Sequence, residues 1–458
     1  MRPFPALATI AAAASLLAVA PAGAATWSPP DTISTPHTFV FGLEAASSND
    51  GSVVADWAFG DGTGADATSG VRGASLPPGA GAFGAERALP PATARVIPYA
   101  RRSVASLQFT PGTSTSRARL AVAFGSVDGP SLGAARTVAT DDVAFRPSFA
   151  VASDGTGLLA WISRASGNRR IVKVSLRAAG GRFGTPSTIA GTGRANSVVA
   201  AVGPQGQRLV AFERSGHLFA RYRPAGRNWS ATEDLGAVAA GTDNHLAALI
   251  TSGGRAMIAD VHRQLTEGGG AGPLFVDAWV RPVGAPRFRA AQRLEQADVQ
   301  AQDPALVPAE SRGAILAWVG GDAGAPATPN GPSTRVRVSV MGADGRFGAA
   351  QPLSAAGQPV TAVAAASNGS AAIVSWVRIA AGSDVSGQVL AAVRPVGGAF
   401  GAPETVSPDE HASETAPGFT AAPASRPLVL WASRPGGEGP GVPIAQIRTF
   451  VRAAQRTP

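Results

Sequence analysis

The amino-acid sequence predicts an all-β protein built as an eight-bladed β-propeller, with seven blades as the alternative count. Three observations predict this fold: a motif that recurs about every 50 residues, an alternating apolar strand with the same period, and frequent turn-forming residues between short apolar runs. The 458-residue chain has 56 glycines and 37 prolines, yet 45% of its residues are hydrophobic, so it can form both turns and a core. No helical periodicity interrupts the pattern, which argues against a helical repeat or a parallel α/β sheet.

The first motif is an aromatic residue followed six positions later by an aliphatic one, as in GRFGTPSTIAG at 181–191. Successive copies begin 46 to 59 residues apart, and one of them begins with leucine. A period of this length indicates an array of one supersecondary unit. The pairs are Trp27/Ile33, Phe83/Leu89, Leu132/Val138, Phe183/Ile189, Trp229/Leu235, Phe288/Leu294, Phe347/Leu353 and Phe400/Val406.

The second marker is an apolar strand that ends in an aromatic residue, and it also occurs once per unit. In one unit, the stretch AMIAD has Asp260 in place of the aromatic residue. Two markers with matching counts support eight units. The aromatic residues are Trp57, Phe109, Trp161, Phe212, Trp318, Trp376 and Trp431.

Each unit reads as four antiparallel strands. In one unit these are FRPSFAVAS (145–153), LLAWIS (158–163), RIVKVSL (170–176) and STIAG (187–191), joined by the turns SDGTG and AAGGR. Four sequential strands in about 50 residues match a propeller blade, whereas an array of β-sandwiches would need Greek-key connections.

The two ends of the chain predict how the ring closes. The stretch TWSPPDTI (26–33) is a fourth strand with no blade before it, and the last unit lacks its own fourth strand. We therefore expect the N-terminal strand to complete the last blade, which covers edge strands without a disulfide.

Residues 1–24 read as a secretory signal peptide: Arg2 is followed by an apolar run at 6–20 and by small residues before a cut at Ala25. Residues 25–458 are expected to form a single, secreted propeller domain. The chain has no cysteine, which excludes disulfides and thiolate metal sites, and no later segment is apolar enough to span a membrane.

The net charge of +9 comes almost entirely from arginine, since Lys173 is the only lysine. The arginines are dispersed, so we expect no nucleic-acid partner. We expect a monomer that binds an extracellular glycan, cell-wall polymer or protein.

Three stretches carry a family resemblance: SVDGPSL (126–132), GADGRFG (342–348) and TWSPPDTI. They resemble the Asp-box repeats of sialidases and bacterial neuraminidases, which lie in the turn between the third and fourth strands of a blade. Asp128 and Asp344 occupy the aspartate position, which most copies here replace. The resemblance implies a sialidase-like propeller, although the Asp box itself is a structural turn.

Sialidase activity would imply three arginines around a carboxylate, a tyrosine activated by a glutamate, and an aspartic acid. Only two tyrosines exist. Tyr222 falls on a third strand, far from the centre, whereas Tyr99 falls on an innermost strand and is the one weak candidate. The family's nucleophile lies late in the chain and its catalytic domains have six blades, which sets this sequence apart.

The long, variable loops predict the binding face, because the second-to-third and fourth-to-first connections share one side of a propeller. The fourth-to-first connections carry repeated polar residues, which we predict to ring the funnel mouth as a polyol or Ca²⁺ site. The same residue types are ordinary turn residues before a strand. No other cofactor or metal site is expected. The predicted ligand-binding residues are Asp141, Asp142, Asp243, Asn244, His245, Asp303, Asp409 and His411.

The leading functional interpretation is a non-catalytic binding module. The first alternative is a glycoside hydrolase with Asp142, Asp243 or Asp303 as acid and base. The second alternative is a structural or envelope scaffold.

Overall fold

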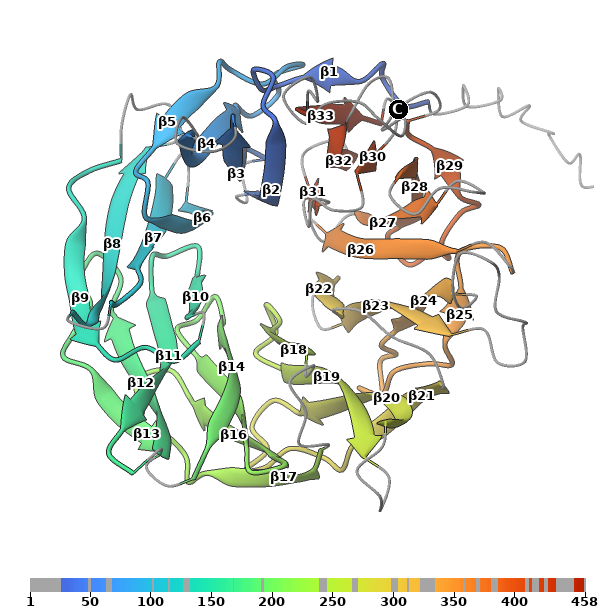
Figure 1. The fold of residues 1–458 in the computed structure, drawn as a ribbon. Helices are drawn as coiled ribbons and strands as arrows, with labels where there is room; N and C mark the ends of the chain where they lie inside the picture. Colours follow the sequence, from blue (N-terminus) through green and yellow to red (C-terminus); the bar gives the residue numbers. More distant parts are fainter. Residues whose placement is uncertain are drawn as a thin grey trace, which may run out of the picture.

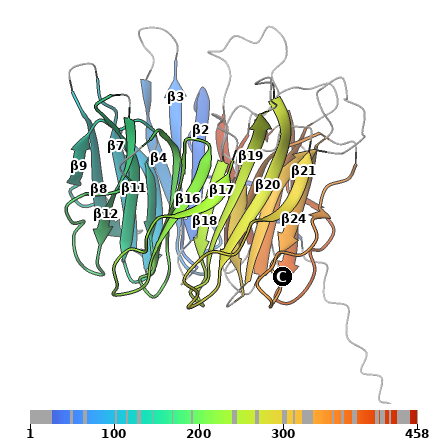
Figure 2. The same cartoon turned by 90° about the horizontal axis from the view of Figure 1, so that it is seen from below.

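In the computed structural model the chain forms a closed ring of eight blades, so the predicted fold is confirmed (Figure 1). Seen from the side, the strands run roughly along the ring axis (Figure 2). Every regular element among the described residues is a β-strand. The structure describes residues 26–456 except 48–50, 63–67, 101–102, 114–115, 127–131, 146, 168, 191–192, 239–244, 266–270, 298–303, 311–312, 322–333, 357–358, 368–370, 380–385, 408–411, 414–419, 424–426 and 434–448.

Blades 1 to 4 are four-stranded antiparallel sheets in which consecutive strands pair. Their strands are β2 (Phe39–Ser47), β3 (Val53–Asp61), β4 (Thr68–Leu76) and β5 (Arg87–Leu89); β6 (Thr93–Ala100), β7 (Ser103–Thr110), β8 (Ala118–Ser126) and β9 (Arg136–Asp141); β10 (Ser148–Val151), β11 (Gly157–Ala165), β12 (Arg169–Arg177) and β13 (Ser187–Ala190); β14 (Ala195–Val202), β15 (Arg208–Arg214), β16 (His217–Arg223) and β17 (Glu233–Ala237).

Blades 5 to 8 follow the same plan, and the short strand β30 (Ala412–Ser413) joins the sheets of blades 7 and 8. Their strands are β18 (His245–Ile250), β19 (Ala256–Leu265), β20 (Ala271–Arg281) and β21 (Gln292–Ala297); β22 (Ala305–Ala309), β23 (Gly313–Gly321), β24 (Thr334–Val340) and β25 (Gln351–Pro352); β26 (Val360–Ser367), β27 (Ala371–Ile379), β28 (Ser386–Pro395) and β29 (Glu404–Thr405); β31 (Thr420–Pro423), β32 (Pro427–Ser433), β33 (Phe450–Gln455) and β1 (Asp31–Thr32).

The N-terminal strand closes the ring, as the sequence predicts. β1 pairs antiparallel with β33, and these first and last strands lie side by side in Figure 1. The backbone amide of Ile33 donates to the carbonyl of Val451 at 2.9 Å. The Ile33 side chain is buried in the cluster between blades 8 and 1. Blade 8 is therefore built from both ends of the chain.

The hydrophobic core is divided among the seams between blades. The described residues form eight apolar clusters, and each cluster joins the facing sides of two neighbouring blades. In six blades the aromatic residue of the second strand packs against the preceding blade, and these six are Trp57, Trp161, Phe212, Trp318, Trp376 and Trp431.

Two blades depart from this arrangement. Phe109 packs in the seam toward blade 3 rather than toward the preceding blade, so it does not occupy the position that its sequence suggests. Asp260 does occupy that position in blade 5, since its neighbour two residues earlier, Ile258, packs against blade 4.

The six-residue motif connects two seams. In the motif of blade 3, Phe183 packs in the seam with blade 2, whereas Ile189 packs in the seam with blade 4. An even spacing in a regular strand would put both side chains on one face. The change of face arises between the two motif residues: Phe183 bridges Arg177 and Ser187 pairs with Val174, so four residue-to-residue steps along one chain segment oppose three along the other. Ile189, two residues after Ser187, is itself the extra residue of a β-bulge between β12 and β13. The register skips the motif aliphatic in the same way at Val138, Leu235 and Leu294.

Candidate functional site

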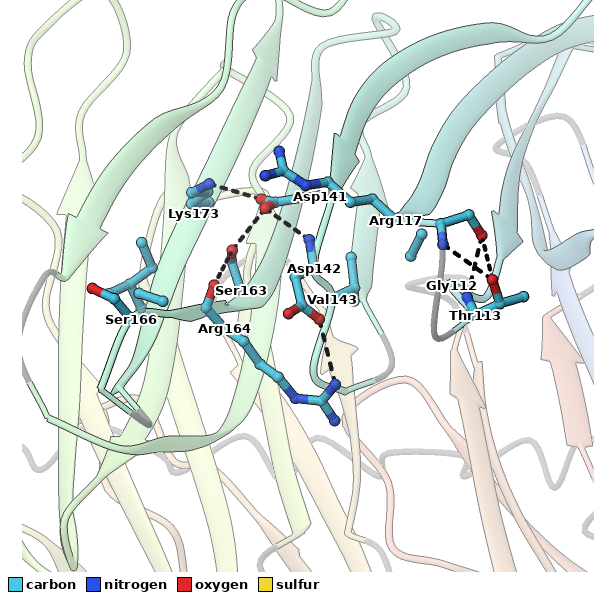
Figure 3. Close-up of a pocket in the computed structure, with 14 residues that line it drawn as sticks. Gly112, Thr113, Arg117, Asp141, Asp142, Val143, Ser163, Arg164, Ser166 and Lys173 are labelled. Atoms are coloured by element: carbon cyan, nitrogen blue, oxygen red, sulfur yellow. Dashed lines mark hydrogen bonds and ion pairs between the residues drawn. The ribbon is translucent and has the colours of Figure 1, made fainter.

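A pocket of about 800 Å³ opens between blades 2 and 3 (Figure 3). It lies where the second strand of each blade ends and where β9 leads into β10, which is the side that the variable loops predict for binding. Most of the surface of the pocket is polar. Its lining residues include Thr113, Ser116, Arg117, Asp141, Asp142, Ser163, Arg164, Ser166 and Lys173.

Asp141 is the most strongly bonded residue of the pocket. It is the last residue of β9, and its side chain crosses to blade 3 (Figure 3). Its Oδ2 accepts hydrogen bonds from Lys173 Nζ at 2.8 Å and from Trp161 Nε1 at 2.9 Å. Its Oδ1 accepts from Ser163 Oγ at 2.8 Å and from the backbone amide of Asp142 at 2.9 Å. Asp141 is 8% exposed and therefore joins the two blades from within the seam.

The environment of Asp141 favours its ionised form. Burial is the largest influence and by itself would raise the pKa of the carboxyl, because a charge is poorly solvated in the seam. The hydrogen bonds from Lys173, Trp161 and Ser163, together with the charge of Lys173, outweigh burial and lower the pKa below its ordinary value. A carboxylate held in this way is unsuited to act as a general acid.

The same arrangement recurs in another seam, which identifies it as part of the scaffold. Between blades 5 and 6, Glu295 accepts a hydrogen bond from Trp318 Nε1 and pairs with Arg337 at 2.9 Å. The basic residue lies directly across from the tryptophan in both seams, because Trp161 pairs with Lys173 and Trp318 with Arg337 in the strand register.

A third seam has the same set of carboxylate, tryptophan and cation, but its tryptophan is Trp27 of the six-residue motif. Between blades 7 and 8, Trp27 Nε1 donates to Glu404 at 2.8 Å and Arg456 pairs with the same carboxylate at 2.7 Å. In every case a carboxylate on a fourth strand holds a tryptophan and a cation of the next blade. Asp141 is accordingly a positioning residue, and Lys173, which the sequence singles out only as the sole lysine, is its partner.

Asp142 faces the open side of the pocket. Its backbone carbonyl accepts the amide of Arg164 at 2.7 Å, so the segment entering β10 already runs along β11. Its carboxylate lies 3.3 Å from Arg164 Nη1, and the side chains are 54% and 61% exposed. Arg117 makes no ion pair with the part of the chain that the structure describes. The pocket thus offers an acidic group, basic groups and several hydroxyls to solvent.

An exposed aromatic ring follows the pocket-lining residues in the chain and stacks with Arg170, which reaches toward blade 4. Phe145 is 38% exposed and comes two residues after Val143, which lines the pocket. The Arg170 guanidinium lies 4.8 Å from the centre of its ring, and Arg170 Nη1 donates to Asn196 Oδ1 of blade 4 at 2.8 Å.

The remaining predicted residues do not join this pocket. His245 is the first residue of β18, the innermost strand of blade 5, where its backbone pairs with Val261. The other predicted ligand-binding residues, Asp243, Asn244, Asp303, Asp409 and His411, lie outside the described residues.

Both tyrosines lie away from Asp142. Tyr222 is on β16, a third strand, where Arg281 lies over its ring at 3.9 Å. Tyr99 is on the innermost strand β6, beside the turn that joins β10 and β11: a Cβ placed on Gly155 would lie 3.2 Å from Tyr99 Cε2. Asp142 lies at the opposite end of β11, and the seven residue-to-residue steps from Gly157 to Arg164 span about 23 Å. A reaction centre that needs both groups is therefore not assembled.

Two general properties complete the description. No group of three or more histidine, aspartate or glutamate side chains within the described ranges has the geometry to hold a metal ion. None of the described residues belongs to a helix able to cross a membrane.

No protein-family model and no curated protein matches this sequence. Solved structures do match it at low identity. An ulvan lyase from a new family of polysaccharide lyases is 10% identical over 76% of this chain and 89% of its own, with a TM-score of 0.45. The β-propeller domain of the Trilobed protease from Pyrococcus furiosus is 9% identical over 78% and 93%, with a TM-score of 0.41. A Hadza microbial sialidase is 12% identical over 76% and 75%, with a TM-score of 0.34. Similarities this low indicate neither a ligand nor a reaction for this chain.

Proposed function

We propose that this chain is a secreted, non-catalytic β-propeller that binds an extracellular glycan in the pocket between blades 2 and 3. The observation that carries the proposal is the solvent-facing Asp142–Arg164 pair at a hydroxyl-lined pocket of about 800 Å³. A carboxylate accepts hydrogen bonds and a guanidinium donates them in a planar fork, so the pair suits the neighbouring hydroxyls of a sugar ring.

The size and polarity of the pocket support a polar ligand. Pockets of about 300–1,000 Å³ hold small molecules, and most are lined by apolar side chains with a few polar groups. This pocket reverses that balance, since hydroxyl and charged groups dominate its lining.

Binding is favoured over glycoside cleavage by the state of the carboxyl groups. Cleavage commonly needs one carboxyl that is protonated and another about 5–9.5 Å away. Asp141 is held ionised by four hydrogen bonds, so Asp141 does not supply the acid. Tyr99 lies at the other end of the blade.

The test is a glycan array followed by calorimetric titration of the best ligand with the mature chain, residues 25–458. We expect Arg164→Gln to weaken binding at least tenfold, the loss of one charged hydrogen bond. Arg182→Gln is the matched control, because Arg182 is exposed on the same blade in the turn between β12 and β13. Equal affinities of the two variants would contradict the site. If the wild type cleaves fluorogenic glycosides and Asp142→Asn does not, the function is glycoside hydrolysis and not binding alone. If the chain binds no glycan, the structural scaffold is the alternative that stands.

A further inference from the structure

The seam between blades 4 and 5 contains a group of buried ionisable side chains. Asp260 takes the place of the aromatic residue that packs on the preceding blade in six other blades. The residue opposite it in the strand register is Asp277, so two carboxyl groups lie side by side. Asp260 is 0% exposed and Asp277 is 4% exposed.

A buried histidine links the two carboxyl groups. His262 Nδ1 lies 3.2 Å from Asp260 Oδ2, and His262 Nε2 lies 3.7 Å from Asp277 Oδ2. Asp277 also accepts two hydrogen bonds from Arg293, at 3.1 and 3.0 Å, whereas neither oxygen of Asp260 has a hydrogen bond of good geometry among the described residues. Arg293 is half-exposed and covers Phe275, so it is the one member of the group that reaches solvent.

Other ionisable groups face the cluster from neighbouring strands. His245 on β18 lowers the pKa of Asp260 through its charge. Glu213 on β15 is buried and lies on the same face of the strand as Leu209 and Ala211, which both pack toward blade 5. On blade 4, His217 and Asp234 form an exposed pair with each other. Asp243, in the connection between the two blades, lies outside the described residues.

The proton balance of this cluster depends on folding. A neutral imidazole has one N–H, so His262 between two ionised carboxylates would direct a lone pair at one of them. Burial is the largest influence on Asp260 and raises the pKa of its carboxyl; the nearby charge of Asp277 raises that pKa further, while the close contact with His262 lowers it. The Asp260 carboxyl therefore holds its proton to a higher pH in the folded chain than in the unfolded chain.

We propose that the seam between blades 4 and 5 is a pH-responsive contact: the folded protein keeps a proton on the buried Asp260 carboxyl, and the seam loosens when that proton is lost. The sign follows from linkage. A group whose pKa is raised by folding gives its stability fully below the unfolded pKa, about 3.9 for aspartate, and loses it as pH rises through the folded value. This inference does not depend on the proposed glycan site.

The test compares denaturant unfolding of the wild type and Asp260→Asn from about pH 4 to about pH 8. A one-proton difference raises the unfolding equilibrium constant up to tenfold per pH unit. We therefore expect the unfolding equilibrium constant of the wild type to rise with pH more steeply than that of Asp260→Asn, by up to tenfold per pH unit. Asp141→Asn is the control of opposite sign: its pKa is lowered, so its effect on the slope should appear only below about pH 4. Parallel pH profiles for the wild type and Asp260→Asn above that pH would overturn the proposal.

A measurement on the wild type keeps the proposal testable if Asp260→Asn does not fold. Amide hydrogen exchange, corrected for the intrinsic pH dependence, should show protection of β15, β19 and β20 falling from about pH 5 to about pH 8. Strands β11 and β12, in the balanced Asp141 seam, should keep their protection. Uniform behaviour of the two seams would contradict a local contact.

Discussion

Replacing Asp141 by asparagine tests whether the carboxylate joins blades 2 and 3. The side chain accepts four hydrogen bonds, two on each oxygen. The side-chain amide of asparagine has one acceptor oxygen and one NH2 group in place of the second oxygen. Two of the four donors therefore face an NH2 group and lose their acceptor. Trp161 is fully buried, so its unpaired indole N–H costs about 1–3 kcal/mol. Lys173 is 26% exposed and can reach water, which reduces its share.

We expect Asp141→Asn to lower the free energy of unfolding by about 2–4 kcal/mol, measured by chemical denaturation at neutral pH. Asp142→Asn is the adjacent control: its ion pair is more than half exposed, so its loss should stay within about 0.5 kcal/mol. A double-mutant cycle of Asp141→Asn with Lys173→Met should give a coupling energy of about 1–3 kcal/mol. Equal losses for Asp141→Asn and Asp142→Asn would refute the role of Asp141.

Three further predictions concern the seams. Trp318→Phe removes the indole donor of buried Glu295 and should cost about 1–2 kcal/mol more than Trp57→Phe, because the Trp57 N–H has no hydrogen-bond partner among the described residues; denaturation of both variants checks this. Ile33→Ala leaves a cavity in the closing seam and should cost about 2–4 kcal/mol, and a loss below about 1 kcal/mol would contradict the packing of β1. The free energy of unfolding should fall with rising pH above about pH 4, and Asp260→Asn should flatten that profile.

The architecture was predictable because its causes are local. Each blade repeats the same order of four strands with similar turn residues and apolar alternation, so a period near 50 residues appears in the sequence itself. Ring closure was predictable from the unmatched strand at Trp27. The position of Phe109 was not, because the face of a strand depends on its register with neighbours.

The site was predictable only in part. The polar connection at Asp141 and Asp142 stood out in the sequence, yet the two adjacent aspartates have different surroundings: one is bonded in the seam and the other is exposed beside Arg164. The Asp-box resemblance, the secretory leader and the ligand stay predictions.

The sequence alone determined the number of units, the strands of each unit and the strand that closes the ring, because periodicity and turn chemistry act over a few residues. Tertiary structure decided which charges meet. Asp141, Trp161 and Lys173 come from three strands of two blades, and Asp260 meets His262 and Asp277 inside a seam. Such encounters depend on how whole sheets stack, and burial between the sheets then determines which of those groups keeps a proton.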